Sequence, residues 1–134
     1  MSDSYLPVLA AVIAALKADA TLTAIVPAAR IYSDVVDNPT FPFVVVSMAS
    51  SPFDTKTTSG MTHTCQVSIF SRKTSPQELG QARSAVYNVL HKQETSFAGI
   101  GVSDIMFNGT APTLKESDGQ TWHCPMQYRI TVGS

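Results

Sequence analysis

The sequence predicts an α+β fold, in which helices pack on one face of a mixed, mainly antiparallel sheet. Apolar residues recur at helical spacing over residues 6–18 and 75–92, and strand-like segments lie between and after them. The last segment, residues 122–132, alternates between a largely apolar and a largely polar set of side chains. The predicted order is α-α-β-β-β-α-β-β, and 134 residues fit a single domain spanning residues 1–134.

The N-terminal segment, residues 6–18, is predicted to be a helix because its apolar side chains repeat every three or four positions: Leu6, Leu9, Ile13 and Leu16. It is too short to span a membrane, and no Lys or Arg precedes it, so we expect a core helix rather than a signal sequence. Thr21 is the expected N-cap of a second short helix over residues 22–26. Residues 30–32 are expected to form a short strand.

The next segments predict a buried strand and a long hairpin. Residues 43–48 are continuously apolar at their centre, which is typical of a strand buried on both faces. Residues 50–60 are rich in Ser and Thr and contain Pro52 and Gly60, so we expect a hairpin tip in preference to a mobile loop. Residues 62–71 alternate like a strand with one buried face.

The sharpest local signal is Ser75-Pro76-Gln77-Glu78, which has the residue types of a capping box with proline in the first helical turn. It predicts a helix to about residue 92, whose buried face is formed by Leu79, Ala82, Val86, Val89 and Leu90. His91 and Lys92 suit the negative C-terminal end of this helix.

The last third of the chain is predicted to hold two strands joined by a polar loop. Residues 102–107 form the first strand, residues 108–120 the loop and residues 122–132 the final strand. Pro125 indicates an edge position or a bulge early in the final strand, because proline cannot donate to a ladder.

Composition argues against a protein that grips nucleic acid. Charged residues make up 14% of the chain and the net charge is −1, whereas a phosphate-binding surface needs an excess of Lys and Arg on one face. Arg72-Lys73 is the only adjacent basic pair. Cys65 and Cys124 lie in strand-like segments and are expected to be free, buried thiols in a reducing compartment.

Catalytic motifs are missing from the sequence. The best metal candidates, His63, Cys65, His123 and Cys124, have residue types that suit zinc. However, the adjacent pair His123 and Cys124 points to opposite faces of a strand, so the four cannot converge. A Gly-x-Ser-x-Gly elbow and a Gly-rich phosphate loop are also absent. We expect no enzyme, no metal and no cofactor; the alternative is a small metal-binding hydrolase built on His63, Cys65 and Cys124.

Short segments spread over nearly the whole chain carry a family resemblance through their order and spacing: Leu16-Lys17-Ala18-Asp19-Ala20, Arg30-Ile31-Tyr32, Phe41-Pro42-Phe43-Val44-Val45-Val46, Cys65-Gln66-Val67-Ser68-Ile69-Phe70, Ala82-Arg83, Val86-Tyr87 and Gln127-Tyr128-Arg129-Ile130. Together they resemble the tail-completion and tail-terminator proteins of long-tailed phages and gene transfer agents. Each segment alone is an ordinary α+β signature, and the loops at residues 50–60 and 108–120 show least of the family pattern.

The resemblance implies a structural virion protein that forms a ring, typically a hexamer, on the head-proximal end of the tail tube. The ring would end tube polymerisation and join the tail to the head connector. Its partners would be further copies of itself, the tail tube protein and a head-completion or stopper protein. DNA would pass through the lumen without specific binding, and no membrane would be involved. The protein would assemble in the bacterial host cytoplasm and remain in the particle's tail.

A closed ring needs contacts between unlike patches of each subunit, which edge strands and polar loops can supply. We expect subunit or partner contacts at Thr55, Lys56, Thr57, Thr58, Met61, Thr62, Thr110, Leu114, Lys115, Glu116, Asp118 and Gln120. Another head–tail connector, a stopper or the tube subunit would share the size and the lack of chemistry, although tube subunits fit the two helical regions less well.

Overall fold

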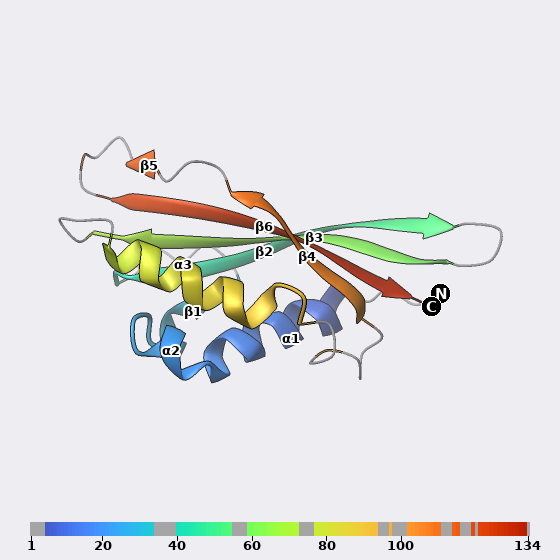
Figure 1. The fold of residues 1–134 in the computed structure, drawn as a ribbon, viewed down its shortest axis with the longest axis horizontal. Helices are drawn as coiled ribbons and strands as arrows, with labels where there is room; N and C mark the ends of the chain where they lie inside the picture. Colours follow the sequence, from blue (N-terminus) through green and yellow to red (C-terminus); the bar gives the residue numbers. More distant parts are fainter. Residues whose placement is uncertain are drawn as a thin grey trace.

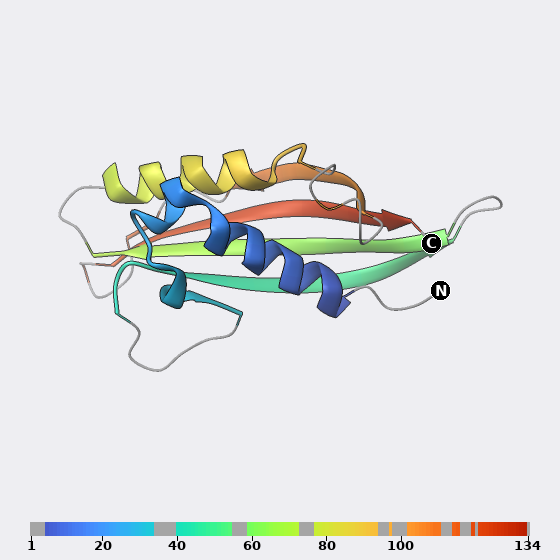
Figure 2. The same cartoon turned by 90° about the horizontal axis from the view of Figure 1, so that it is seen from below.

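A computed structural model describes residues 5–33, 40–54, 59–72, 77–93, 97, 102–110, 114–115, 119 and 121–133. Figure 1 shows a long twisted sheet with the helices on one face, and Figure 2 shows the two main helices side by side along it. The predicted α+β class is therefore confirmed. Within the described ranges, no helix has the length and apolarity that crossing a membrane requires.

Helix α1, Tyr5–Ala18, packs on the sheet through a line of side chains spaced four residues apart, namely Val8, Val12 and Leu16. The sequence pattern placed Leu6 in the apolar stripe, but its side chain is 71% exposed. Leu9 and Ile13 are partly buried at the flank of the contact. The buried face of α1 is therefore rotated about the helix axis, away from Leu6 and toward Val8 and Val12, because these two valines and Leu16 lie directly over the sheet.

Helix α2, Ala20–Thr23, is capped by a different residue from the one predicted. The backbone N–H of Leu22 donates to Asp19 Oδ2 at 2.8 Å, so Asp19 is the N-cap and Thr21 lies inside the helix. Asp19 has extended backbone angles, and its carboxylate is stabilised by the positive end of the helix. These two properties explain why Asp19, and not Thr21, is the N-cap. A 3-10 turn, Ala28–Arg30, then leads into β1, Ile31–Tyr32.

The remaining elements are listed in chain order: β2 Phe43–Asp54, β3 Ser59–Ser71, α3 Gln77–Leu90, β4 Val102–Thr110, β5 Leu114–Lys115 and β6 Trp122–Gly133. The strand order across the sheet is β1-β2-β3-β6-β4, and β5 also pairs with β6. Among the described strand pairs, only β1–β2 is parallel. The structure thus adds a 3-10 turn and β5 to the predicted elements.

Strands β2 and β3 form a hairpin that reaches far beyond the strand predicted at residues 43–48. Their register is continuous from Phe43↔Phe70 to Asp54↔Ser59, so most of residues 50–60 is paired strand. Alternate residues in this part of β2, among them Ser51, bond their backbone groups to β3, which polarity alone does not reveal. The preference for a hairpin over a mobile loop was right.

Alternation along the strands separates a core face from an open face. Under α1 and α3, the sheet buries Val44, Val46, Cys65, Val67, Ile69, Ile105, Cys124, Met126, Tyr128, Ile130 and Val132. On the opposite face Ser47 and Ala49 are exposed and Val45 is only half-buried. The prediction that residues 43–48 are buried on both faces was therefore wrong, because the helices cover one face only.

Helix α3 buries Leu79, Ala82, Ala85, Val86 and Leu90, close to the predicted set. The capping residues Ser75 and Pro76 lie outside the described residues. Glu78 instead accepts a hydrogen bond from Ser71 Oγ at 2.7 Å, which ties the start of α3 to the end of β3.

Strand β6 is an inner strand, contrary to an edge assignment for its first half. Pro125 lies where β4 has ended, at the Thr110↔Met126 pair, and before β5 pairs at Leu114↔His123. The proline thus falls between the described pairings of β6 with β4 and with β5, so its missing N–H removes none of those ladder bonds.

Candidate functional site

The structure divides the predicted contact residues between the two ends of β6. Met61 of β3 pairs with Val132, whereas Leu114 of β5 pairs with His123. About 30 Å of extended strand separates these positions. Figure 1 accordingly shows β5 and the β2–β3 hairpin at opposite ends of the long axis.

The other predicted contacts extend these two groups or lie beyond the described chain. Thr62 is next to Met61 and half-buried, while Thr110 ends β4 and Lys115 ends β5. Those outside the described residues are Thr55, Lys56, Thr57, Thr58, Glu116, Asp118 and Gln120.

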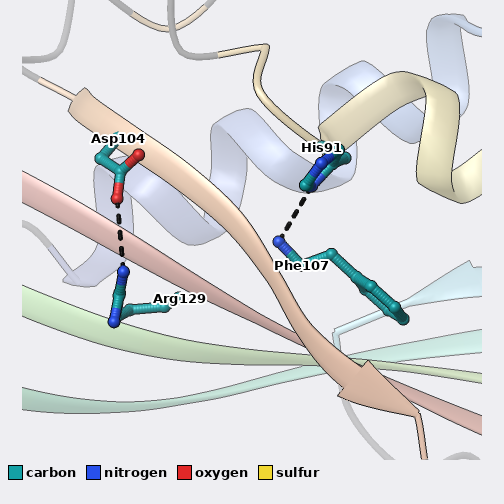
Figure 3. A network of polar contacts seen from close by, with 4 residues as sticks. All are labelled: His91, Asp104, Phe107 and Arg129. Carbon is teal, nitrogen blue, oxygen red and sulfur yellow. Dashed lines mark hydrogen bonds and ion pairs between the residues drawn. The ribbon is translucent and has the colours of Figure 1, made fainter.

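The open face of the sheet carries small and uncharged side chains along its centre. One row across β2, β3 and β6 is Ser47, Gln66 and Gln127. Farther toward the hairpin, Arg129 is the basic member of the next row, and its guanidinium lies 3.8 Å from Asp104 (Figure 3). Both groups are substantially exposed, so this ion pair is worth at most about 1 kcal/mol. The face therefore presents hydroxyl and amide groups with little net charge.

An aromatic cluster occupies the other end of the open face. The Phe70 ring stacks on Phe43 at a centroid distance of 4.7 Å and on His123 at 4.3 Å. Phe41 packs edge-on against Phe43, and the Arg72 guanidinium lies 4.1 Å from the Phe41 centroid. Because both sides of the Phe70 ring are occupied and Arg72 contacts Phe41, this cluster is not an open platform for stacking nucleobases.

The C-terminal end of α3 closes the outer edge of β4. The Lys92 N–H donates to the Ile105 carbonyl at 2.9 Å, and the Phe107 N–H donates to His91 Nδ1 at 3.1 Å (Figure 3). Lys92 adopts a φ of 57°, which turns the chain toward the strand. The sequence placed His91 at the helix end but did not reveal this contact with β4.

The outer edge of β2, by contrast, is covered over a short stretch. Strand β1 pairs with Val44 and Val45, and no other described strand lies on that side. Ala49, Ser50 and Pro52 are exposed. This edge was not predicted, because residues 50–60 have the composition of a hairpin tip. The signal that could have indicated it is the uncharged segment at residues 43–53, which contains Pro52.

The candidate catalytic and metal-binding residues do not assemble into a site. Cys65 pairs with Tyr128, whereas Cys124 pairs with Ile69, so the two thiols lie apart along the strands. His123 points to the opposite face from Cys124. Among the described residues, no three His, Cys, Asp or Glu side chains form a group that could hold a metal ion.

One polar pair has the spacing of a nucleophile and its base. Ser50 Oγ and His63 Nδ1 are 2.6 Å apart and join the paired residues of β2 and β3. The His63 side chain is fully buried, so a substrate could not reach its ring. The geometry supports a structural bond between strands.

Burial suppresses the acidity of two core groups. It raises the pKa of the Cys65 thiol from 9.0 to about 12, the reverse of what a reactive thiolate needs. Burial also raises the pKa of Tyr128 above its ordinary value, and the Tyr128 hydroxyl has no hydrogen-bond partner in the described part of the chain. Neither group is prepared for proton transfer near neutral pH.

Stability should fall above about pH 9 through Cys65. The unfolded thiol ionises near its ordinary pKa of 9.0 while the folded thiol stays protonated until about 12. The stabilisation is complete below pH 9 and is lost as the pH rises toward 12. Between pH 8 and pH 10, the free energy of unfolding measured with urea should fall by about 1.4 kcal/mol less for Cys65→Ala than for the wild type. Equal losses would contradict the raised pKa.

A hollow of about 630 Å³ lies between α2 and α3, lined by small or uncharged side chains that include Thr21, Ile25, Gly80 and Ala85. A Cβ added at Gly80 would meet open space. Among the described residues, the side chains that line this hollow are all uncharged.

Comparisons with known proteins identify a family and a similar fold. The family model described as tail completion protein gp17 matches residues 10–133. A solved structure titled "Virion of native gene transfer agent (GTA) particle" contains a chain with a similar fold, at a TM-score of 0.78 and 19% identity. The similarity covers 94% of each chain. No curated protein sequence matches.

Proposed function

The chain belongs to the tail completion protein gp17 family, and from this premise we propose that it forms a ring that caps the tail tube. It is a structural protein of the tail of a phage-like particle. In our proposal, the ring sits at the head-proximal end, ends tube polymerisation and joins the tail to the head connector. Its partners are further copies of the chain, the tube protein and a head-completion or stopper protein.

The observation that carries this proposal is the separation of Met61 and Leu114 to opposite ends of β6. A joining ring needs one surface for the tube and another for the head, facing opposite ways along the tail. About 30 Å of β6 holds the two ends apart at a fixed spacing. Such a rigid spacer supports a subunit that contacts two different partners axially.

The open face and the overall charge suit a lumen through which DNA slides. The central rows carry mostly hydroxyl and amide groups, and the chain has a net charge of −1. Because the sequence has no excess of Lys and Arg over Asp and Glu, little counterion release is available to hold DNA.

Particles assembled with and without the chain test this function. Electron microscopy should show tails of regular length, with a ring at one end, only when the protein is present. Without it we expect overlong tails that do not join heads, because nothing stops tube growth. Tails of unchanged length in its absence, with normal head joining, would overturn the proposal.

The substitution Met61→Lys, with Gln127→Lys as its control, tests whether the hairpin end of the sheet contacts a partner. Met61→Lys places a charge beside the hairpin tip on a half-buried position of β3. If this end contacts a partner, the variant should fold but fail to appear on tails. The control Gln127→Lys places the same charge on an exposed central position of the open face and should still add to tails.

A further inference from the structure

The direction of each backbone group in the sheet can be deduced from the contacts at β4. The Ile105 carbonyl and the Phe107 N–H bond to the end of α3, so both residues turn their backbone groups away from β6. In antiparallel strands these directions alternate residue by residue. Met106 therefore turns its backbone groups toward Arg129 of β6, with which it is paired.

The same alternation continues across β6 and β3 to β2. Arg129 faces β4, so its neighbour Tyr128 faces Cys65 of β3. Thr64 of β3 then faces Ala49 of β2, and the register between these strands has no shift. Alternate residues of β2 consequently direct their backbone groups to the outer edge: Met48, Ser50 and Pro52.

The position of Pro52 supports this assignment of inward and outward backbone groups along β2. Proline is tolerated within sheets where its missing N–H would face an edge. With this alternation of inward and outward residues, the N–H that Pro52 lacks would point outward. The hydrogen bonds between β2 and β3 are therefore intact, as their continuous register requires. Beyond β1, the open edge therefore offers the N–H and carbonyl groups of Met48 and Ser50 and the carbonyl of Pro52.

We propose that, in the ring, this Met48–Pro52 edge is filled by an extended segment of the neighbouring copy of the chain. The inference rests on the proposed ring function. Donors and acceptors that recur at every second residue match the backbone of another strand. The edge also lacks the charges with which monomeric proteins protect exposed strands, since residues 43–53 carry none.

The two edges of the sheet explain why the contact is head-to-tail. The β4 edge is blocked at its centre, where Lys92 and His91 bond to Ile105 and Phe107, whereas the β2 edge is open beyond β1 within the described residues. A sheet with one closed edge cannot grow by repeated edge pairing between β2 and β4. A neighbour must instead supply a different segment, which gives the unlike patches of a closed ring. The near-neutral chain adds little repulsion between copies.

Hydrogen exchange at single-residue resolution tests the proposal on the wild-type chain. Amides of Met48 and Ser50 should exchange at least about 100-fold more slowly on tails than in the isolated subunit. Amides of Ser47 and Ala49 already face β3 and serve as internal controls, with a much smaller change. A ring seen on the tails without slower exchange at Met48 and Ser50 would overturn this inference and leave the proposed function standing. Absence of any ring would overturn both.

A crosslinking experiment identifies the occupant. A photoreactive residue at Ser51, which is exposed beside the edge, should crosslink to a segment of the same chain. In rings mixed from ¹⁴N and ¹⁵N protein, crosslinked peptides of mixed isotope would show that the segment comes from a second copy. Crosslinks to the tube or head protein, or between two β2 strands, would overturn the proposal.

The variant Ser50→Pro adds a functional test. It removes one outward N–H and, like Pro52, spares the bonds to β3, so the isolated subunit should keep its circular dichroism spectrum. Its occupancy on tails should fall at least about tenfold, since one hydrogen bond of a shared ladder is lost and the approach is blocked. The control Ser50→Ala loses the hydroxyl contact with His63 but keeps the N–H, and should retain occupancy. Normal occupancy of Ser50→Pro would contradict the proposal.

Discussion

Replacement of Leu16 by alanine should lower the free energy of unfolding by about 3 kcal/mol. Leu16 is fully buried and, with Val8 and Val12, holds α1 against the sheet. Truncating a buried leucine removes its transfer free energy and leaves a cavity that a close-packed core fills only in part. Urea denaturation followed by circular dichroism measures the change.

Leu6→Ala is the matched control within the same helix. The Leu6 side chain is largely exposed, so its truncation should change stability by no more than about 0.5 kcal/mol. Both substitutions change helix propensity in the same way, which isolates the contribution of burial. Equal effects at the two positions would contradict the rotated packing of α1.

Replacement of His91 by phenylalanine should destabilise the protein by about 1–3 kcal/mol and promote self-association. Phenylalanine retains a ring that can stack on Tyr87, as His91 does at 4.6 Å, but it cannot accept from the Phe107 N–H. The edge of β4 would then expose an unpaired donor. Thermal unfolding and sedimentation velocity measure the two effects.

The substitution His91→Asn provides the opposite control, because it loses the ring but offers Oδ1 as an acceptor close to the position of Nδ1. It should be closer to the wild type in association state than His91→Phe. If His91→Phe keeps the association state and the stability of the wild type, the contact of His91 with β4 is not important for the protein.

The fold class could be predicted from periodicity, because alternation in residues 62–71 and 122–132 directly reflects one buried face. The buried face of α3 was also close to prediction, with Ala85 in place of Val89. Periodicity could not predict the rotation of α1 about its own axis, because Leu6 and Val8 are both apolar and either could face the sheet. Packing against β2 decided between them.

Less of the candidate interaction surface could be predicted. Residues 50–52 are two serines and a proline, which resemble a loop, yet residues 50–54 form strand because β3 pairs with all of them. The closed β4 edge depends on His91 and Phe107, which are far apart in the sequence. The open edge of β2 depends on how short β1 is. These are properties of the assembled sheet, and a local pattern does not carry them.

The number of copies per tail, measured against tail length, distinguishes a capping ring from a component of the tube. Purified tails can be fractionated by length, and in each fraction the protein can be quantified against the tube subunit with isotope-labelled peptide standards. Antibodies to an N-terminal epitope then locate the protein on the tails by electron microscopy. For a capping ring, we expect a constant number of copies per tail at every length, with the label at the head-proximal end alone. Copy number that rises with tail length, or label along the tube, would contradict it and identify a tube component instead.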